Sequence, residues 1–193
     1  MIEWSDELSP FDYMMFRADA DPHSRTTIMT VELLDPDRTA FRLAMDRASR
    51  IVPRLRQHVV APLVPLASAR WVIDPDFDLD YHLRWISLPG PAGLREVLDL
   101  AQIDQATPLD PHRPLWEVTV IEGVEDGDAR CALVWKLSHA VTDGVGGMIL
   151  DRVIRSEERH PKPEATPPVP EPEDVSALDL TRSAARGLPA ALL

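Results

Sequence analysis

The fold of this chain is decided by the stretch LWEVTVIE (residues 115–122), EDGD (125–128) and RCALVWKL (130–137). The first and last of these segments are rich in β-branched and apolar residues, which favour strands. The acidic segment between them contains a glycine and is typical of a tight turn. The stretch therefore predicts two long antiparallel strands joined as a hairpin.

The second strand leads directly into SHAVTDG (138–144), which is followed by the glycine-rich apolar segment VGGMIL (145–150). This order predicts a strand end, a tight loop and a helix start. Such a loop presents the imidazole of His139 at the rim of a sheet, where a substrate can reach it. A histidine can take a proton from a hydroxyl or thiol near neutral pH, so the pattern H-x-x-x-D-G marks His139 as a candidate general base.

The rest of the chain alternates between helical and extended patterns. Ser9 is a good N-cap for a first helix, with Pro10 at its first position and Asp12 in its first turn. Further helices are expected at 39–52, 91–105 and 145–158, and strands at 27–34 and 69–73. The apolar segment 57–66 is broken by Pro62 and Pro65, so any strand in it is an edge or a strand start. The alternation of apolar and polar residues over 77–83 predicts a half-buried strand or extended segment. Together these elements predict an α/β fold, with a mixed, mostly antiparallel sheet flanked by helices.

The composition changes at His160, where six prolines follow within thirteen residues among Glu and Ala. Such a segment does not form a packed element and is typical of an extended linker. Beyond it, residues 175–193 are weakly helical in pattern. We therefore expect a domain over 1–159, and over 160–193 a proline-rich linker with the start of a further helix.

The composition limits the classes of partner. The chain has 193 residues and a formal net charge of −12, which argues against a nucleic-acid partner because phosphate binding needs a basic face. A single cysteine, Cys131, allows no internal disulfide. We expect no signal peptide, since the first residues are acidic, and no membrane-spanning helix, since no apolar run approaches about 20 residues. The expected location is the cytoplasm, with attachment to the surface of a membrane or lipid droplet left open.

Several segments, in the right order, resemble the bacterial wax ester synthase/acyl-CoA:diacylglycerol acyltransferase family of the chloramphenicol-acetyltransferase-like superfamily. LSPFDYMMF (8–16) is similar to the opening helix of that family, and PRLRQ (53–57) to the segment after its second helix. FDLDYHL (77–83) resembles an extended stretch, Pro114-Leu115-Trp116 a strand start, and SHAVTDG the HHxxxDG signature. The resemblance covers residues 5–159 and implies a chloramphenicol-acetyltransferase-like half domain.

The chain departs from the family pattern in two ways. The first histidine of the signature is Ser138 here, whereas the second, which is read as catalytic in the family, is kept as His139. Family members are also longer and carry a C-terminal half of the same general fold, with the active-site tunnel between the two halves. This chain resembles the N-terminal half and the start of the crossover.

The resemblance implies acyl transfer from acyl-CoA to diacylglycerol or a long-chain alcohol, that is, triacylglycerol or wax ester synthesis. His139 would act as the catalytic base, with Ser138, Asp143 and Gly144 supporting the active-site loop. Leu115 and Trp116 would pack near the acyl tunnel. Acyl-CoA would be a substrate, and no cofactor and no metal are expected. The expected partners are acyl-CoA, the acceptor lipid, and either a missing C-terminal half or a second copy of the chain.

Other interpretations remain open at this stage. Cys131 could be a catalytic thiol, although an apolar strand favours a buried residue. Ser138 could be a nucleophile, although adjacent residues at a strand end point apart. The alternating Asp74, Asp76, Asp78 and Asp80 could bind calcium or form a solvated acidic face. The whole chain could be a non-catalytic truncated relative that binds lipid or a partner chain, or a condensation domain of peptide synthesis.

Overall fold

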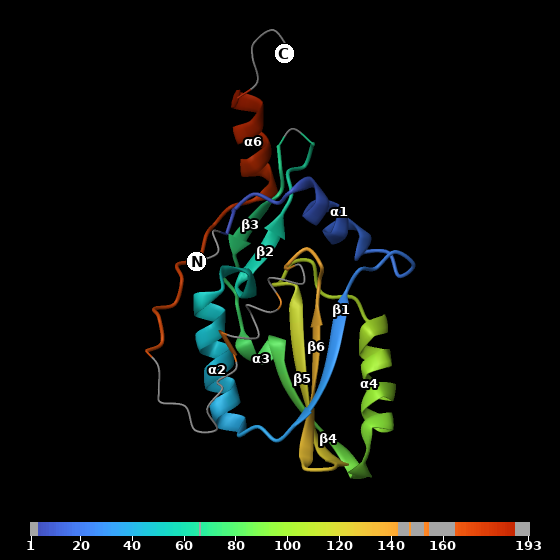
Figure 1. Cartoon of the computed structure of the whole chain (residues 1–193). Helices are drawn as coiled ribbons and strands as arrows, with labels where there is room; N and C mark the ends of the chain where they lie inside the picture. Colours follow the sequence, from blue (N-terminus) through green and yellow to red (C-terminus); the bar gives the residue numbers. More distant parts are fainter. Residues whose placement is uncertain (1–3, 66, 143–146, 148–152, 155–164, 188–193) are drawn as a thin grey trace.

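The computed structural model of the chain describes residues 4–65, 67–142, 147, 153, 154 and 165–187. Its centre is a four-stranded sheet in the order β1-β6-β5-β4 (Figure 1). The strands are β1 (Ile28–Leu34), β4 (Leu83–Ala92), β5 (Trp116–Asp126) and β6 (Ala129–Leu137). β1 and β5 run antiparallel to β6, whereas β4 runs parallel to β5. The prediction of a mixed, mostly antiparallel sheet flanked by helices is therefore confirmed.

β5 and β6 form the predicted hairpin. Trp116 lies opposite Leu137 at the open end, and Asp126 lies opposite Ala129 at the turn. Gly127 in this turn has a φ of 60°, a backbone conformation that glycine adopts at little cost. The hairpin is thus long enough to carry residue 138 from the turn to the far end of the sheet.

The two faces of the sheet are covered by different helices (Figure 1). α2 (Arg38–Ile51) packs with Met45 and Ala48 against a core that includes Val118, Val120 and Leu133. α4 (Leu94–Ala106) packs with Val97 and Ala101 against a second core, which contains Ile121, Ala132 and Val134. Because successive strand residues point to opposite faces, these alternating residues place α2 and α4 on opposite sides.

The ends of the helices follow their sequence signals. The Ser9 hydroxyl accepts from the backbone N–H of Asp12 at 3.1 Å, so Ser9 caps α1 (Pro10–Ala18) as predicted. Asp37 caps α2 in the same way, through a 2.7 Å bond from the backbone N–H of Ala40. α2 ends at Ile51, before Pro53 in the short 3₁₀ helix η1 (Pro53–Leu55), which agrees with the expected helix stop.

A small second sheet lies beside the N-terminal segment. It consists of the antiparallel strands β2 (Gln57–Val60) and β3 (Arg70–Ile73), both shorter than the sequence suggested. The backbone N–H of Leu8 donates to Ala69 O at 2.9 Å, and that of Trp71 donates to Asp6 O at 2.8 Å. These bonds attach the segment before α1 to β3.

The prediction of an extended segment over 77–83 was wrong. Asp78 caps a single helical turn, α3 (Leu79–His82), by accepting from the backbone N–H of Asp80 at 2.9 Å. The turn buries Leu79 and His82, which are three residues apart and so share one side of a helical turn, in place of the alternating pattern that suggested a strand. The true strand, β4, begins only at Leu83 and runs to Ala92, and the following helix accordingly starts at Leu94.

The described part of the proline-rich segment, residues 165–176, has no regular secondary structure and joins α6 (Ala177–Gly187). It contacts the body at two points that the linker prediction did not include. The Arg50 guanidinium donates to Pro167 O at 3.2 Å, and the backbone N–H of Glu173 donates to Ile73 O at 3.4 Å. The domain boundary at 159/160 stays a prediction.

Candidate active site

His139 is the second residue beyond β6, which ends at Leu137, and its neighbour Ser138 bonds to Asp19 at the end of α1. Its side chain is exposed, whereas its neighbours Ser138, Ala140 and Val141 are all buried. No hydrogen bond or ion pair to its imidazole is found among the residues that the structure describes. The loop therefore presents the His139 imidazole to solvent, while its described neighbours Ser138, Ala140 and Val141 are packed in the interior.

Ser138 fixes the start of this loop through four hydrogen bonds. Its backbone N–H donates to Leu115 O at 3.0 Å, and its carbonyl accepts from the backbone N–H of Val141 at 3.0 Å. Its hydroxyl donates to the carboxylate of Asp19 and accepts from the backbone N–H of Ala140 at 3.1 Å. The hydroxyl is thus directed to α1, and the described residues contain no Ser138–His139 hydrogen bond of the kind that an activated serine needs.

Asp19 is the contact that the sequence did not reveal. It follows the last residue of α1, and its second carboxylate oxygen accepts from the backbone N–H of Thr26 at 2.8 Å and from the Thr26 hydroxyl at 3.0 Å. Asp19 and Ser138 are 119 positions apart, so no local pattern in the sequence relates them. The nearest signal is the position of Asp19 directly after a helix, where a polar residue is common for many reasons.

The remaining predicted site residues fall into two groups. Asp143 and Gly144 lie outside the described residues, so their proposed support of the loop stays a prediction. Leu115 and Trp116 are both buried, and the Trp116 indole N–H donates to Leu55 O at 2.9 Å. Both pack in the core on the α2 side of the sheet, and their position relative to an acyl tunnel also stays a prediction.

His82 is a second histidine near the site, but it is fully buried. Its ring stacks on Trp116 at 4.7 Å and on Phe77 at 5.3 Å between centroids, and Nδ1 lies 2.7 Å from Trp116 O. Burial lowers the pKa of His82 to about 4, although the bond to the Trp116 carbonyl acts in the opposite direction. His82 is therefore neutral at pH 7 and serves as an aromatic core residue.

A buried charge cluster lies under the opposite face of the same sheet end. Lys136 is fully buried, and its ammonium group is 3.4 Å from Asp104 of α4 and 3.7 Å from Glu117. Glu117 in turn pairs with Arg84 at 2.8 Å. The lysine two residues before Ser138 thus ties β6 to the C-terminal end of α4.

The alternative sites considered from the sequence receive no support from the local geometry. Asp74 is buried and pairs with Arg113 at 3.5 Å, while Asp80 pairs with Arg42 at 2.8 Å. Within the described ranges, no group of three or more His, Cys, Asp or Glu side chains is arranged to hold a metal ion. Cys131 is buried, and burial raises the pKa of its thiol, which disfavours a reactive thiolate.

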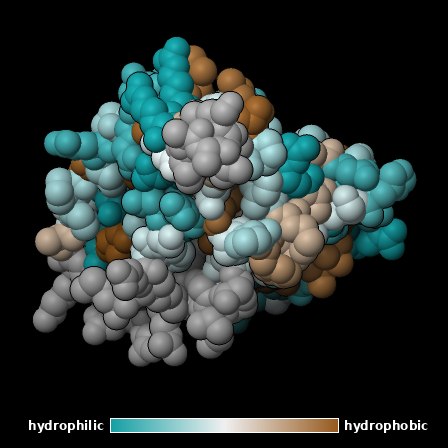
Figure 2. Space-filling model, turned by 90° about the horizontal axis from the view of Figure 1, so that it is seen from above, coloured by the Kyte–Doolittle hydropathy of each residue, from teal (hydrophilic) through white to brown (hydrophobic). Residues whose placement is uncertain are grey.

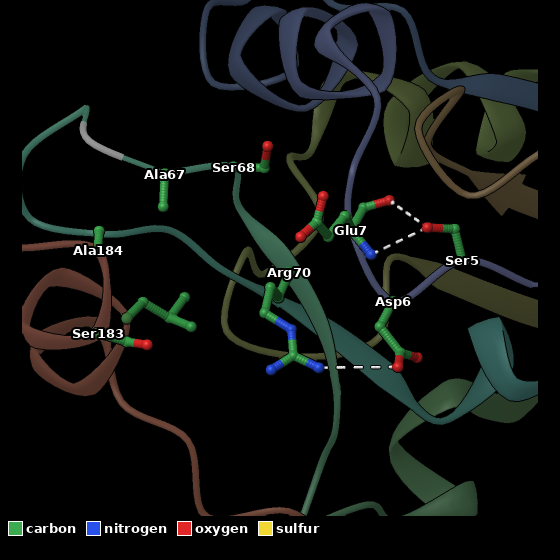
Figure 3. Close-up of a pocket in the computed structure, with 9 residues that line it drawn as sticks. Ser5, Asp6, Glu7, Ala67, Ser68, Arg70, Ser183 and Ala184 are labelled. Carbon is green, nitrogen blue, oxygen red and sulfur yellow. Dashed lines mark hydrogen bonds and ion pairs between the residues drawn. The ribbon is translucent and has the colours of Figure 1, made fainter. Parts of the chain in front are cut away.

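Two hollows lie at the end of the molecule that carries α1 and α6. One, of about 820 Å³, lies between α1 and the β2–β3 loop, and is lined by residues such as Tyr13, Arg17 and Leu63. The other, of about 500 Å³, is lined by residues 5–7, Arg70 and α6, and Arg70 in it faces Asp6 at 3.7 Å (Figure 3). None of the predicted site residues that the structure describes, namely Leu115, Trp116, Ser138 and His139, lines either hollow.

The same end has a mixed surface. Seen from above, apolar patches lie among hydrophilic residues (Figure 2). Phe11 and Met14 of α1 and Leu63 of the β2–β3 loop are among the exposed apolar side chains of the described chain. None of the described helices is both long and apolar enough to cross a bilayer.

Comparison with known proteins assigns the family. The family model of the wax ester synthase/diacylglycerol acyltransferase catalytic domain matches residues 4–193. A Mycobacterium tuberculosis H37Rv protein named "putative diacyglycerol O-acyltransferase" is 52% identical over 191 residues, which are 98% of this chain and 38% of that protein. A second protein with this kind of name from the same strain is 36% identical over 152 residues, covering 75% of this chain and 33% of its own length.

Solved structures agree with this assignment. The wax ester synthase/diacylglycerol acyltransferase from Marinobacter aquaeolei VT8 superposes with a TM-score of 0.60 at 27% identity, over 85% of this chain and 40% of that one. The starter condensation domain of rhizomide synthetase gives a TM-score of 0.60 at 14% identity, over 79% of this chain and 36% of its own, and so shares the fold alone. The chain spans about two fifths of the length of the 52%-identical M. tuberculosis protein and of the Marinobacter enzyme. It belongs to the wax ester synthase/diacylglycerol acyltransferase catalytic domain family.

Proposed function

We propose that this chain supplies the catalytic base of an O-acyltransferase that moves a fatty acyl group from acyl-CoA to diacylglycerol or a long-chain alcohol. The observation that carries the proposal is the exposed imidazole of His139, which makes no hydrogen bond or ion pair to any residue that the structure describes and lies just beyond β6 between buried neighbours. The family membership and the names of the relatives support the reaction class.

In the proposed reaction, an imidazole nitrogen of His139 removes the proton from the acceptor hydroxyl while the oxygen attacks the thioester carbonyl. The tetrahedral intermediate then collapses, the C–S bond breaks, and the CoA thiolate takes the proton back from the imidazolium. The acyl group passes directly from sulfur to oxygen, so no acyl-enzyme is formed. General-base help of this kind is typically worth about 10²–10⁴-fold in rate.

The surroundings of His139 fit a base that acts on the acceptor hydroxyl better than one that activates Ser138 as a nucleophile. The Ser138 hydroxyl donates a hydrogen bond to the Asp19 carboxylate, so it is not directed at His139 as the hydroxyl of an activated serine nucleophile would be. Asp143 and Gly144 are proposed to complete the loop. Acyl-CoA is a substrate in this scheme, and the reaction as written needs no metal and no further cofactor.

The acceptor and acyl tunnel are proposed to form between this chain and a second half-domain. The fraction of the relatives' length that the chain spans supports this arrangement. A second copy of the chain is the alternative cover. The exposed apolar side chains at the α1 end also support peripheral contact with a membrane or lipid droplet.

The test is ester formation by the chain alone and by the chain mixed with the C-terminal half of its 52%-identical M. tuberculosis relative. Radiolabelled palmitoyl-CoA is supplied with hexadecanol or dioleoylglycerol, and both ester and free CoA are measured. The chain alone should be close to inactive, because in this proposal the second half-domain supplies one wall of the tunnel and some of the oxyanion donors. Losing one oxyanion donor costs about 10²–10³ in rate, and losing substrate positioning costs more. The mixture should form ester and CoA in equal amounts.

A non-catalytic role is the second candidate, and the exposed apolar side chains Phe11, Met14 and Leu63 at the α1 end favour it. In that case the chain binds lipid or a partner chain through the face that a second half would cover. Palmitoyl-CoA or diacylglycerol binding by the chain, without ester formation in any mixture with a folded C-terminal half, would select this candidate over the enzyme.

A further inference from the structure

Asp19 connects three segments that meet beside His139. It caps the C-terminal end of α1 with a 3.1 Å bond from its backbone N–H to Met15 O. One carboxylate oxygen accepts two bonds from Thr26, in the loop before β1, and the other accepts the hydroxyl of Ser138. The carboxylate thus joins α1, the start of β1 and the His139 loop.

The two oxygens of the Asp19 carboxylate accept hydrogen bonds from different segments, one from Thr26 and the other from Ser138. Among the described residues, no Lys, Arg or His nitrogen lies within ion-pair distance of it, so its partners are hydroxyl and amide donors. Such donors fix a carboxylate oxygen along defined directions, whereas a mobile cation would not. The Ser138 hydroxyl, having donated to Asp19, has its lone pairs free for the backbone N–H of Ala140 at 3.1 Å.

These bonds fix the backbone on both sides of His139, which lies between Ser138 and Ala140. Ser138 and Ala140 are both buried. The Ser138 hydroxyl is held by Asp19 and in turn accepts the backbone N–H of Ala140, so the backbone orientation of His139 depends on where that hydroxyl is held. Arg25 anchors the same region a second time, because it donates to Asp19 O at 3.3 Å and to Ala106 O at the end of α4 at 2.8 Å. The loop is therefore braced from outside its own strand.

We propose that Asp19 is a positioning residue for His139, acting through the Ser138 hydroxyl. This rests on the proposed function, in which His139 is the base. Asp19, at the C-terminal end of α1, accepts the hydroxyl of Ser138, at the first position of the motif. The carboxylate thereby fixes the direction of the Ser138 hydroxyl.

The first test uses the chain alone and needs no activity. In a ¹H–¹³C spectrum of the chain with ¹³Cε1-labelled histidine, Asp19→Ala should shift or broaden the His139 signal. Asp19→Asn, whose amide can still accept from Thr26 and bond the Ser138 hydroxyl, should leave it near the wild-type position. Asp21→Ala is the matched control: the Asp21 carboxylate also caps a loop N–H, that of His23 at 2.9 Å, but has no bond to the motif. An unchanged His139 signal in Asp19→Ala would overturn the proposal.

The second test uses the active mixture with the C-terminal half. Asp19→Ala should lower kcat about 10–100-fold with the KM for acyl-CoA within about twofold, because a misplaced base slows chemistry and leaves substrate binding intact. Asp19→Asn should recover most of kcat, and Asp21→Ala should match wild type. If His139→Ala is inactive but Asp19→Ala retains full kcat, the positioning proposal fails and the base assignment stands. If His139→Ala is fully active, the proposed function fails first.

Discussion

Trp116 and Lys136 lie at the same end of the sheet, but on opposite faces and in opposite surroundings. Trp116 is packed in the core on the α2 side, between aromatic rings, with its single N–H donating to Leu55 O. Lys136 is equally buried, but on the α4 side, where it lies between two carboxylates. Lys136 is close to the motif in sequence, since Ser138 follows it by two residues, whereas Trp116 is close to it in space, since the backbone N–H of Ser138 donates to the carbonyl of Leu115.

The difference shows two ways of holding one loop. The apolar face supplies most of the stability, because burying large apolar surface is the dominant favourable contribution to folding. The charged face contributes less stability, because the desolvation of buried charges largely offsets their attraction. Its charges do fix which part of α4 meets β6. The loop that carries His139 starts where these two kinds of packing meet.

The largest expected effect is on the apolar face. Trp116→Ala removes a fully buried indole, its stacking on His82 and the bond to Leu55 O. We expect the free energy of unfolding to fall by about 3–5 kcal/mol, as measured by urea denaturation. Ile103→Ala, at a 67% exposed position on α4, is the control and should change it by less than about 0.5 kcal/mol. A loss for Trp116→Ala as small as the control's would show that this core is loosely packed.

The same face should be sensitive to acid. The pKa of His82 falls from 6.5 to about 4 on folding, so the unfolded chain binds the proton first as pH drops. Stability from this group is complete above pH 6.5 and is lost as pH falls toward 4. Between pH 7 and 4.5 the wild type should lose about 2 kcal/mol more than His82→Phe. Parallel urea curves at the two pH values measure this, and equal losses in both proteins would contradict it.

A smaller effect is expected on the charged face. Lys136→Met leaves Glu117 buried with only Arg84 as a cation partner, which should lower the free energy of unfolding by about 2 kcal/mol. The double variant Lys136→Met/Glu117→Leu should regain most of that loss, because both charges are then replaced by apolar groups. A double variant less stable than the single one would mean that the pair itself stabilises the fold.

The sequence predicted most of the fold because its signals are local. The hairpin rests on two apolar strands and a glycine turn, and α1 on Ser9 and Pro10, and both formed as expected. The failure at 77–83 has a physical cause: four residues are too few to separate a period of 2 from a period of 3.6. The cap by Asp78 decides between them in favour of a helical turn.

The site was predictable only in part. The exposed position of His139 just beyond a strand end was predictable because the strand and the loop are contiguous in sequence, whereas its role as the base stays a prediction. Asp19 was missed because its bond to Ser138 depends on how α1 packs against the end of β6, which only the tertiary structure defines. The buried state of Lys136 was missed for the same reason, since a lysine in a strand is more often exposed.

The central claim is that His139 is the base, and the most direct measurement is CoA release by the chain mixed with the complementary C-terminal half. His139→Ala should lower kcat by about 10²–10⁴-fold, while His23→Ala, at an exposed histidine in the loop after α1, should leave it unchanged. Both variants should have the same midpoint of urea unfolding as the wild type, because neither side chain is buried. Full activity of His139→Ala in that mixture would contradict the account.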